Sequence, residues 1–179
     1  MKNDISALGN ALVDTVFKVE HSLIAELGLE IDQMTLSSAE EHAPIIERLI
    51  ASGAETVSDC GGSATNSLVA ASSFGASCFH TCKVSNDEDG TRYLQSLKAA
   101  GVGHKGNMAS ADSIPTGKCL ILVTPDAKRT MTTALNVSSL MDESDLDLDQ
   151  ISNSKIFYIE GYMVTSEENY NVCLLYTSP

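Results

Sequence analysis

The chain has 179 residues, of which 43% are hydrophobic and 20% charged, a composition typical of a globular protein with one sizeable core. No run of apolar residues approaches the roughly 20 that a membrane span needs, so we expect no membrane association. The formal net charge of −13 repels nucleic-acid phosphates, and no cluster of Lys and Arg offsets it, which excludes DNA and RNA as partners.

The predicted elements alternate between strands and helices. The first half of the chain predicts strand structure over residues 5–20 with a break at Gly9, a helix from Ser37 or Ser38 to about Ser52, a helix over 62–74, a strand over 77–84 and a helix over 87–100 closed by Gly101. The second half predicts strands over 116–124 and 128–135, a helix over 142–151, a buried strand over 155–159 and a helix from Ser166.

This alternation indicates an α/β fold with a mostly parallel sheet covered by helices. The two strands around Pro125, Asp126 and Ala127 interrupt it, because that tripeptide is typical of a hairpin turn. The hairpin therefore predicts a small β appendage on the main sheet.

The two ends of the chain carry separate expectations. Residues 1–4 lack the basic and apolar regions of a signal peptide, so a cytoplasmic protein is expected. Residues 173–179 (CLLYTSP) resemble the translation of a sequencing adapter, and we expect them to be no part of the natural protein. The five cysteines include no CxxC pair and no His at metal-ligand spacing, so free thiols are expected rather than disulfides or a zinc site.

The first segment with chemical potential is GNALVD, residues 9–14. A carboxylate at a strand end, such as that of Asp14, can accept hydrogen bonds from two adjacent hydroxyls, as proteins do when they hold a ribose. Taken alone, an exposed or turn Asp is the commoner explanation.

The second segment is CGGSATNS, residues 60–67. Paired glycines before a helix allow close backbone approach and leave N–H donors free, and Asn66 follows one helical turn later. A plain strand-to-helix turn explains a lone glycine pair equally well. The segment lacks the third glycine of a dinucleotide fingerprint and the Gly-Lys-Ser/Thr of a P-loop.

The third segment is PTGKC, residues 115–119, followed by Lys128, Arg129 and Thr130. A glycine within a strand marks close approach by a backbone or a ligand, and an arginine beside a hairpin can reach a phosphate. By itself, Arg129 is more simply explained as a surface residue.

Together, the three segments resemble the PfkB/ribokinase family of carbohydrate and nucleoside kinases in order and spacing. The family's glycine-pair signature is matched by Gly61, Gly62, Ala64, Asn66 and Gly75. Within the family, GNALVD, GGSATNS, PTGKC and YIEGYM (residues 158–163) look most like adenosine kinases, and the resemblance covers roughly residues 5–171.

The resemblance implies a substrate site. Asn10 and Asp14 would face the nucleoside, with Asp14 on the ribose hydroxyls, and the Gly61–Gly62 pair would also act as a lid hinge. The remaining residues that the resemblance implies are Ser63 and Asn66 beside the glycine pair, Gln33, Cys119, Met131 and Met163 around the base, and Arg129 near the transferred phosphate.

The implied fold is a ribokinase-like α/β core with a β lid. Residues 1–172 would form the N-terminal part of a kinase domain, with the lid drawn from about 13–36 and 103–135. The family's catalytic Gly-Ala-Gly-Asp motif does not occur here, so we expect a fragment without its C-terminal half, and we expect the fragment alone to be inactive and poorly folded. No catalytic residue and no metal ligand is assigned.

The implied activity of the full-length parent is transfer of the γ-phosphate of ATP, with Mg²⁺, to the 5′ hydroxyl of adenosine. The alternative is a PfkB sugar kinase acting on ribose, fructose or a keto-deoxy sugar acid. A non-catalytic ligand-binding or inert chain is the alternative of another class. The expected partner is a small nucleoside or sugar, and the family resemblance also allows a homodimer through the lid.

Overall fold

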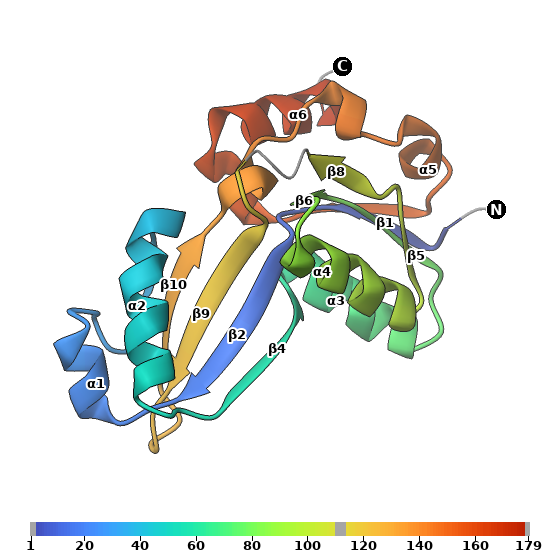
Figure 1. The fold of residues 1–179 in the computed structure, drawn as a ribbon. Coiled ribbons are helices and arrows are strands. Elements are labelled where there is room, and N and C mark those ends of the chain that lie inside the picture. The colour runs from blue at the N-terminus through green and yellow to red at the C-terminus, as the bar shows by residue number, and fades with distance from the viewer. Residues whose placement is uncertain (1–2, 110–113, 178–179) are drawn as a thin grey trace.

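The computed structural model describes residues 3–109 and 114–177, which fold around two main sheets (Figure 1). The first sheet has the order β11-β1-β5-β7 and all of its pairs are parallel. Its strands are β1 (Ile5–Leu8), β5 (Cys78–Thr81), β7 (Val102–His104) and β11 (Ile156–Ile159). The predicted parallel α/β core is therefore confirmed.

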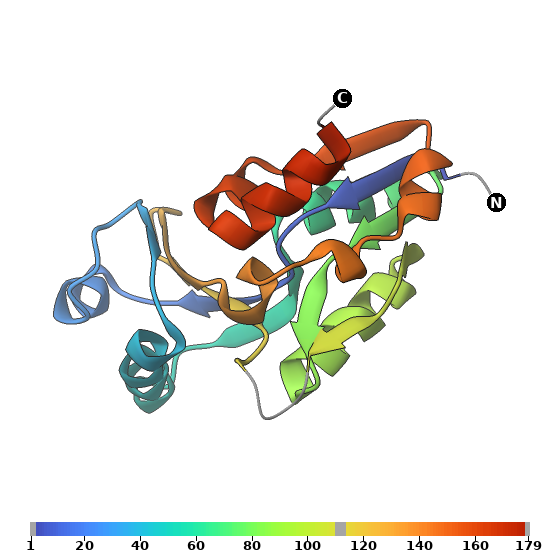
Figure 2. The same cartoon turned by 90° about the horizontal axis from the view of Figure 1, so that it is seen from above.

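Helices cover both faces of this sheet, as the view from above shows (Figure 2). Helices α3 (Ser63–Ser73) and α4 (Glu88–Ala99) pack on one face around Ala7, Leu68 and Leu97. On the other face, α5 (Leu148–Ser152) and α6 (Glu167–Thr177) belong to a cluster around Leu8. The other short helical turns are η1 (Asn136–Ser139), η2 (Glu143–Asp145) and η3 (Gly161–Thr165).

The second sheet has five strands in the order β3-β10-β9-β2-β4 and mixes parallel and antiparallel pairs. Its strands are β2 (Leu12–Lys18), β3 (Met34–Leu36), β4 (Thr56–Gly61), β9 (Gly117–Val123) and β10 (Arg129–Ala134). Helices α1 (His21–Glu26) and α2 (Ala39–Ala51) lie against one face of this sheet, around Phe17, Leu120 and Leu122. We call this face the back of the sheet and the opposite face its front. This arrangement leaves the front of the sheet to face the start of α3.

Two predicted elements match closely because local chemistry defines them. Ser38 caps α2, with its hydroxyl accepting from Glu41 N and the Glu41 carboxylate accepting from Ser38 N, so both ends of the capping box are present. Strands β9 and β10 form the predicted antiparallel hairpin. Ala127, at its turn, has a φ of 62°.

Three predictions need correction. Residues 142–151 form two short elements, η2 and α5, because Asp142 and Asp147 each cap a separate turn. Residues 77–84 are split between β5 and β6 (Lys83–Ser85), which pairs with β8 (Asn107–Ala109) in a separate two-stranded sheet. Strand β11 is half-exposed rather than buried, since it has only one neighbour in its sheet.

The segments predicted to form the lid are divided between different sheets. The five-stranded sheet takes β2, β3, β9 and β10 from them and adds β4, which was not predicted. Strands β7 and β8, within residues 103–135 or next to them, pair with β5 and β6 instead. Residues 110–113 of that segment, and 178–179 of the adapter-like tail, lie outside the described residues.

In the described part of the chain, no helix has both the length and the apolar character required to cross a membrane.

Candidate functional site

A pocket of about 230 Å³ lies between the front of the five-stranded sheet and the start of α3. Strands β2, β3, β9 and β10 supply most of its wall, and residues after β11 complete it. The lining residues are Asn10, Leu12, Asp14, Met34, Leu36, Gly62, Ser63, Asn66, Cys119, Ile121, Arg129, Met131, Thr133, Leu135, Glu160 and Tyr162.

The alternation of side chains along β9 explains how the sheet forms both a core and a pocket. Leu120 and Leu122 point to the back and are buried among the side chains of α1 and α2. Cys119 and Ile121 point to the front and line the pocket. Because side chains alternate between the two faces of a strand, successive residues of β9 contribute in turn to the core and to the pocket.

Asp14 is the acidic residue of the five-stranded sheet that lines the pocket. Burial raises the pKa of its carboxyl to about 6, an effect that Arg129 partly opposes and Asp59 reinforces. Within the described residues, no hydrogen bond reaches the Asp14 side chain, although its carboxylate packs directly on Gly61 of β4. A Cβ at position 61 would overlap that carboxylate, so the glycine makes room for it.

The start of α3 forms the wall beside Asp14. Gly62 is the residue before the helix and has a φ of 98°, which favours glycine. Ser63 and Asn66 follow with exposed side chains, and neither side chain makes a hydrogen bond with another described residue. Their hydroxyl and amide groups can therefore both donate to a ligand and accept from it.

Arg129 and Cys119 extend the wall along the hairpin. Arg129, the first residue of β10, is exposed and makes no ion pair within the described part of the chain. Cys119 accepts a hydrogen bond from the Thr133 hydroxyl at 3.3 Å, and burial raises the pKa of its thiol to about 11. The cysteine is therefore a neutral wall residue, and Arg129 is the cation available to an anionic group.

Glu160 is the polar residue that the sequence interpretation missed. It follows β11, is 2% exposed, and accepts hydrogen bonds from Asn10 N, Asn10 Nδ2 and Ala64 N at 2.8, 2.9 and 2.8 Å. An acidic residue directly after a strand of a parallel sheet was the available signal, since ligand sites gather at that edge.

Three predicted site residues do not line the pocket. Gln33 is exposed and contributes only its carbonyl, which accepts from Met131 N at 2.8 Å, while its neighbour Met34 faces the pocket. Gly61 lies behind Asp14, and Met163 is fully buried in the cluster under α6. The pocket instead gains Leu36, Ile121 and Leu135, which belong to no quoted motif, and Tyr162, which lies in the YIEGYM segment but was not predicted as a site residue.

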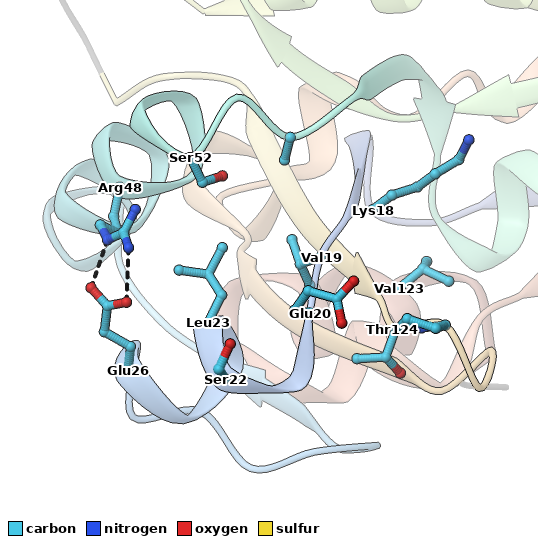
Figure 3. A pocket seen from close by; sticks show the side chains of 12 residues that line it. Lys18, Val19, Glu20, Ser22, Leu23, Glu26, Arg48, Ser52, Val123 and Thr124 are labelled. Carbon is cyan, nitrogen blue, oxygen red and sulfur yellow. Dashed lines mark hydrogen bonds and ion pairs between the residues drawn. The ribbon is translucent and has the colours of Figure 1, made fainter.

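A second pocket, of about 530 Å³, lies beside α1 at the back of the five-stranded sheet (Figure 3). Its two cations are already paired. Arg48 contacts Glu26 at 2.6 Å, and Lys18 contacts Glu55 at 2.7 Å. None of the sequence-predicted site residues lies in it, so the smaller pocket is the better candidate.

The described residues contain no group of three or more His, Cys, Asp or Glu placed to hold a metal ion. The candidate site offers hydrogen-bonding groups, two carboxylates, one cation and an apolar wall, and none of its residues is assigned as a Mg²⁺ ligand.

Comparison with protein families assigns the chain to one family. The family model described as pfkB family carbohydrate kinase matches residues 29–175. A search of curated proteins gave no significant match.

Solved structures match over nearly the whole chain. The adenosine kinase from Sinorhizobium meliloti is 27% identical with a TM-score of 0.86, over 95% of this chain and 50% of that one. A probable sugar kinase from Rhizobium etli is 24% identical (TM-score 0.88; 97% and 52%). An Anopheles gambiae adenosine kinase in complex with a diadenosine tetraphosphate is 23% identical (TM-score 0.81; 98% and 52%). The chain thus spans about half the length of the structures it matches.

Proposed function

Because the chain belongs to the pfkB family of carbohydrate kinases, we propose that its pocket binds the phosphate acceptor of a kinase. We further propose that the acceptor is adenosine, and that the full-length protein containing this chain transfers the γ-phosphate of ATP to its 5′ hydroxyl.

The environment of the Asp14 carboxylate is the main support for this proposal. Its carboxylate faces the pocket and has no hydrogen-bond partner among the described residues, although burial already makes its charge costly. A vicinal diol supplies two adjacent O–H donors that match the two carboxylate oxygens. A ribose bound at Asp14 would provide the hydrogen bonds that the protein does not.

The apolar wall favours a nucleoside over a free sugar. Met34, Leu36, Ile121, Met131 and Leu135 all line the pocket. A free sugar would leave most of this surface without a partner, whereas a purine ring would bury it. The likeness to the Sinorhizobium meliloti adenosine kinase supports the same choice.

A PfkB sugar kinase is the second candidate, since Asp14 and Asn66 would serve ribose or fructose as well. A keto-deoxy sugar acid fits less well, because the lining residues include two carboxylates, Asp14 and Glu160, and only one cation, Arg129. A non-catalytic binding role is the third candidate.

The chain's own residues would act by positioning the acceptor. Phosphoryl transfer depends on alignment and charge neutralisation more than on covalent chemistry by the protein. Asp14, Ser63 and Asn66 would orient the sugar, and Arg129 is placed to meet a phosphate. ATP would supply the phosphoryl group with Mg²⁺, whose ligands we do not assign to this chain. A homodimer through the five-stranded sheet stays a prediction.

A substrate panel tests the proposal. Full-length protein would be supplied with ATP, Mg²⁺ and either adenosine, ribose, fructose or a keto-deoxy sugar acid, and ADP release would be followed. We expect the highest kcat/KM for adenosine. Turnover of ribose or fructose at least as efficient as that of adenosine would support the sugar kinase, and no turnover of any acceptor would support the non-catalytic role.

A further inference from the structure

Glu160 is a buried carboxylate whose partners come from two distant segments. Its Oε1 accepts from Asn10 N at 2.8 Å and from Asn10 Nδ2 at 2.9 Å, and its Oε2 accepts from Ala64 N at 2.8 Å. The residues that it joins are 150 and 96 positions away in the sequence. A single side chain thus links the end of β11, the β1–β2 connection and the first turn of α3.

The contact with Ala64 replaces a missing helix cap. Gly62, the residue before α3, has no side chain to cap the helix, and Ala64 N belongs to the first turn. The positive end of the helix dipole and the free N–H favour an acceptor with negative charge there. Glu160 provides this acceptor from another part of the chain.

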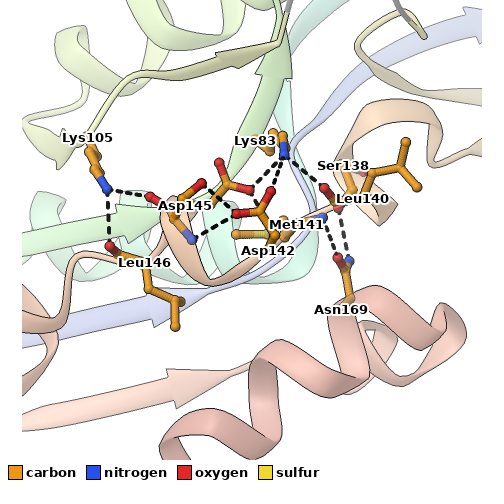
Figure 4. A network of polar contacts seen from close by, with 10 residues as sticks. Lys83, Lys105, Ser138, Leu140, Met141, Asp142, Asp145, Leu146 and Asn169 are labelled. Atoms are coloured by element: carbon orange, nitrogen blue, oxygen red, sulfur yellow. Dashed lines mark hydrogen bonds and ion pairs between the residues drawn. The ribbon is translucent and has the colours of Figure 1, made fainter.

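Asn10 is held from its other side as well. Its Oδ1 accepts from Asn169 Nδ2 at 3.0 Å, and Asn10 is 1% exposed. Asn169, on α6, is itself fixed, because it donates to Ser138 O at 2.9 Å and accepts from Met141 N at 3.1 Å (Figure 4). The orientation of the Asn10 amide is therefore set by Glu160 and Asn169 together.

Glu160 and its contacts to Asn10 and Ala64, which we call the Glu160 clamp, leave little free space around them. A Cβ at Gly9 would overlap Ala64 Cβ and would come within 2.8 Å of Glu160 Oε2. The strand connection and the helix start consequently meet at the carboxylate without room for another group between them.

From these contacts we propose that Glu160 is a positioning residue for the acceptor site. It fixes Asn10 and the start of α3, and with them Gly62, Ser63 and Asn66, in the wall that faces Asp14. This inference rests on the proposed function, since the wall is positioned for the acceptor.

The test compares Glu160→Gln with a matched variant, Asp145→Asn, in the full-length protein. Asp145 is also a buried acid, 6% exposed, and it pairs with Lys83 at 2.8 Å, but it does not line the pocket (Figure 4). Both substitutions replace a buried carboxylate by an amide of the same shape, so both are expected to lower the Tm.

The acceptor kinetics separate positioning from stability. We expect Glu160→Gln to raise the KM for adenosine by about tenfold and to change the KM for ATP by less than about twofold. Asp145→Asn is expected to leave both KM values within about twofold of the wild type. An unchanged adenosine KM in Glu160→Gln, or a parallel rise of both KM values, would overturn the inference.

Hydrogen exchange on the same proteins separates this inference from the proposed function. We expect the amides of Asn10 and Ala64 to exchange faster in Glu160→Gln and at the wild-type rate in Asp145→Asn. If adenosine is not a substrate, the proposed function fails, and the exchange rates still decide whether the clamp exists. Wild-type exchange at both amides in Glu160→Gln would refute the clamp itself.

Discussion

Two acidic residues line the same pocket, and their surroundings differ. Glu160, after β11 of the parallel sheet, accepts three hydrogen bonds from the protein. Asp14, on β2 of the five-stranded sheet, accepts none from the described residues, and burial raises the pKa of its carboxyl to about 6. Both residues lose water, but only Glu160 recovers hydrogen bonds within the fold.

The difference separates Glu160, which we propose builds the site, from Asp14, which we propose serves a ligand. A partly buried carboxylate without hydrogen-bond partners destabilises the folded chain, and such groups are retained where function needs them. A satisfied carboxylate holds neighbouring backbone in place. The five-stranded sheet shows the same division on its two faces, with a packed back and an open front.

The largest effect is expected from the back of that sheet. Leu122 is fully buried, so Leu122→Ala should lower the free energy of unfolding by about 2–5 kcal/mol through lost packing and a cavity. Ile121, on the pocket face next to it, is also buried but belongs to none of the core clusters, so Ile121→Ala should cost less stability and should raise the adenosine KM more. Denaturant unfolding and acceptor kinetics would measure both properties, and equal changes for the two variants would show that the two faces of the sheet do not differ in role.

The pH dependence of stability should reveal Asp14. Its folded pKa of about 6 lies above its ordinary value of 3.8, so the folded state keeps the proton while the unfolded state ionises. Stability should therefore fall as pH rises from about 4 to 6 and then level off, a loss of about 3 kcal/mol at pH 7.

Asp14→Asn provides the control for this profile. The variant should match the wild type near pH 4 and exceed its stability at pH 7, and chemical unfolding at several pH values would show the difference. A variant that is less stable than the wild type at pH 7 would assign Asp14 a structural role.

Loss of the Asp14 carboxylate should change the affinity for adenosine by no more than it changes stability. Asp14→Ala should weaken adenosine binding by about 1.5–3 kcal/mol, the range for hydrogen bonds to a charged group. The melting temperature should not fall, because Asp14 supports no core cluster. An early melt with unchanged adenosine affinity would contradict the site.

The smallest effect is expected for Cys119. Its thiol lines the pocket, is kept neutral by a pKa of about 11, and makes one weak hydrogen bond with Thr133. Cys119→Ala should change both the adenosine affinity and the stability by about 1 kcal/mol or less. A loss as large as that of Asp14→Ala would mean that the sulfur contacts the ligand closely.

The elements that the sequence predicts well are those defined by neighbouring residues. Ser38 and Glu41 cap α2 within four residues, and the turn at Pro125–Ala127 defines the hairpin. Strand β4 was missed because Val57 is its most apolar residue and is exposed, so the strand lacks the alternation of a half-buried one.

Site residues that belong to local motifs are likewise easier to predict than those that depend on distant contacts. Asp14, Gly62 and Asn66 belong to short motifs, and motif spacing is visible in the sequence. The position of Glu160 after a strand marks it as a candidate in the sequence, but its hydrogen-bond partners lie 96 and 150 residues away and only the fold identifies them. The choice between Gln33 and Met34 depends on the pairing of β3 with β10, where a shift of one residue turns each side chain to the other face.

Proton release on adenosine binding tests most directly whether Asp14 is held ready for a ligand. Calorimetric titrations of the full-length protein would be compared in buffers of different ionisation enthalpy. With a pKa of about 6, Asp14 is half protonated at pH 6, and a diol that donates to the ionised carboxylate should displace about half a proton per adenosine. We predict this release at pH 6, its disappearance at pH 8, and its absence in Asp14→Asn. Binding without proton release at pH 6, or the same release in Asp14→Asn, would contradict the account.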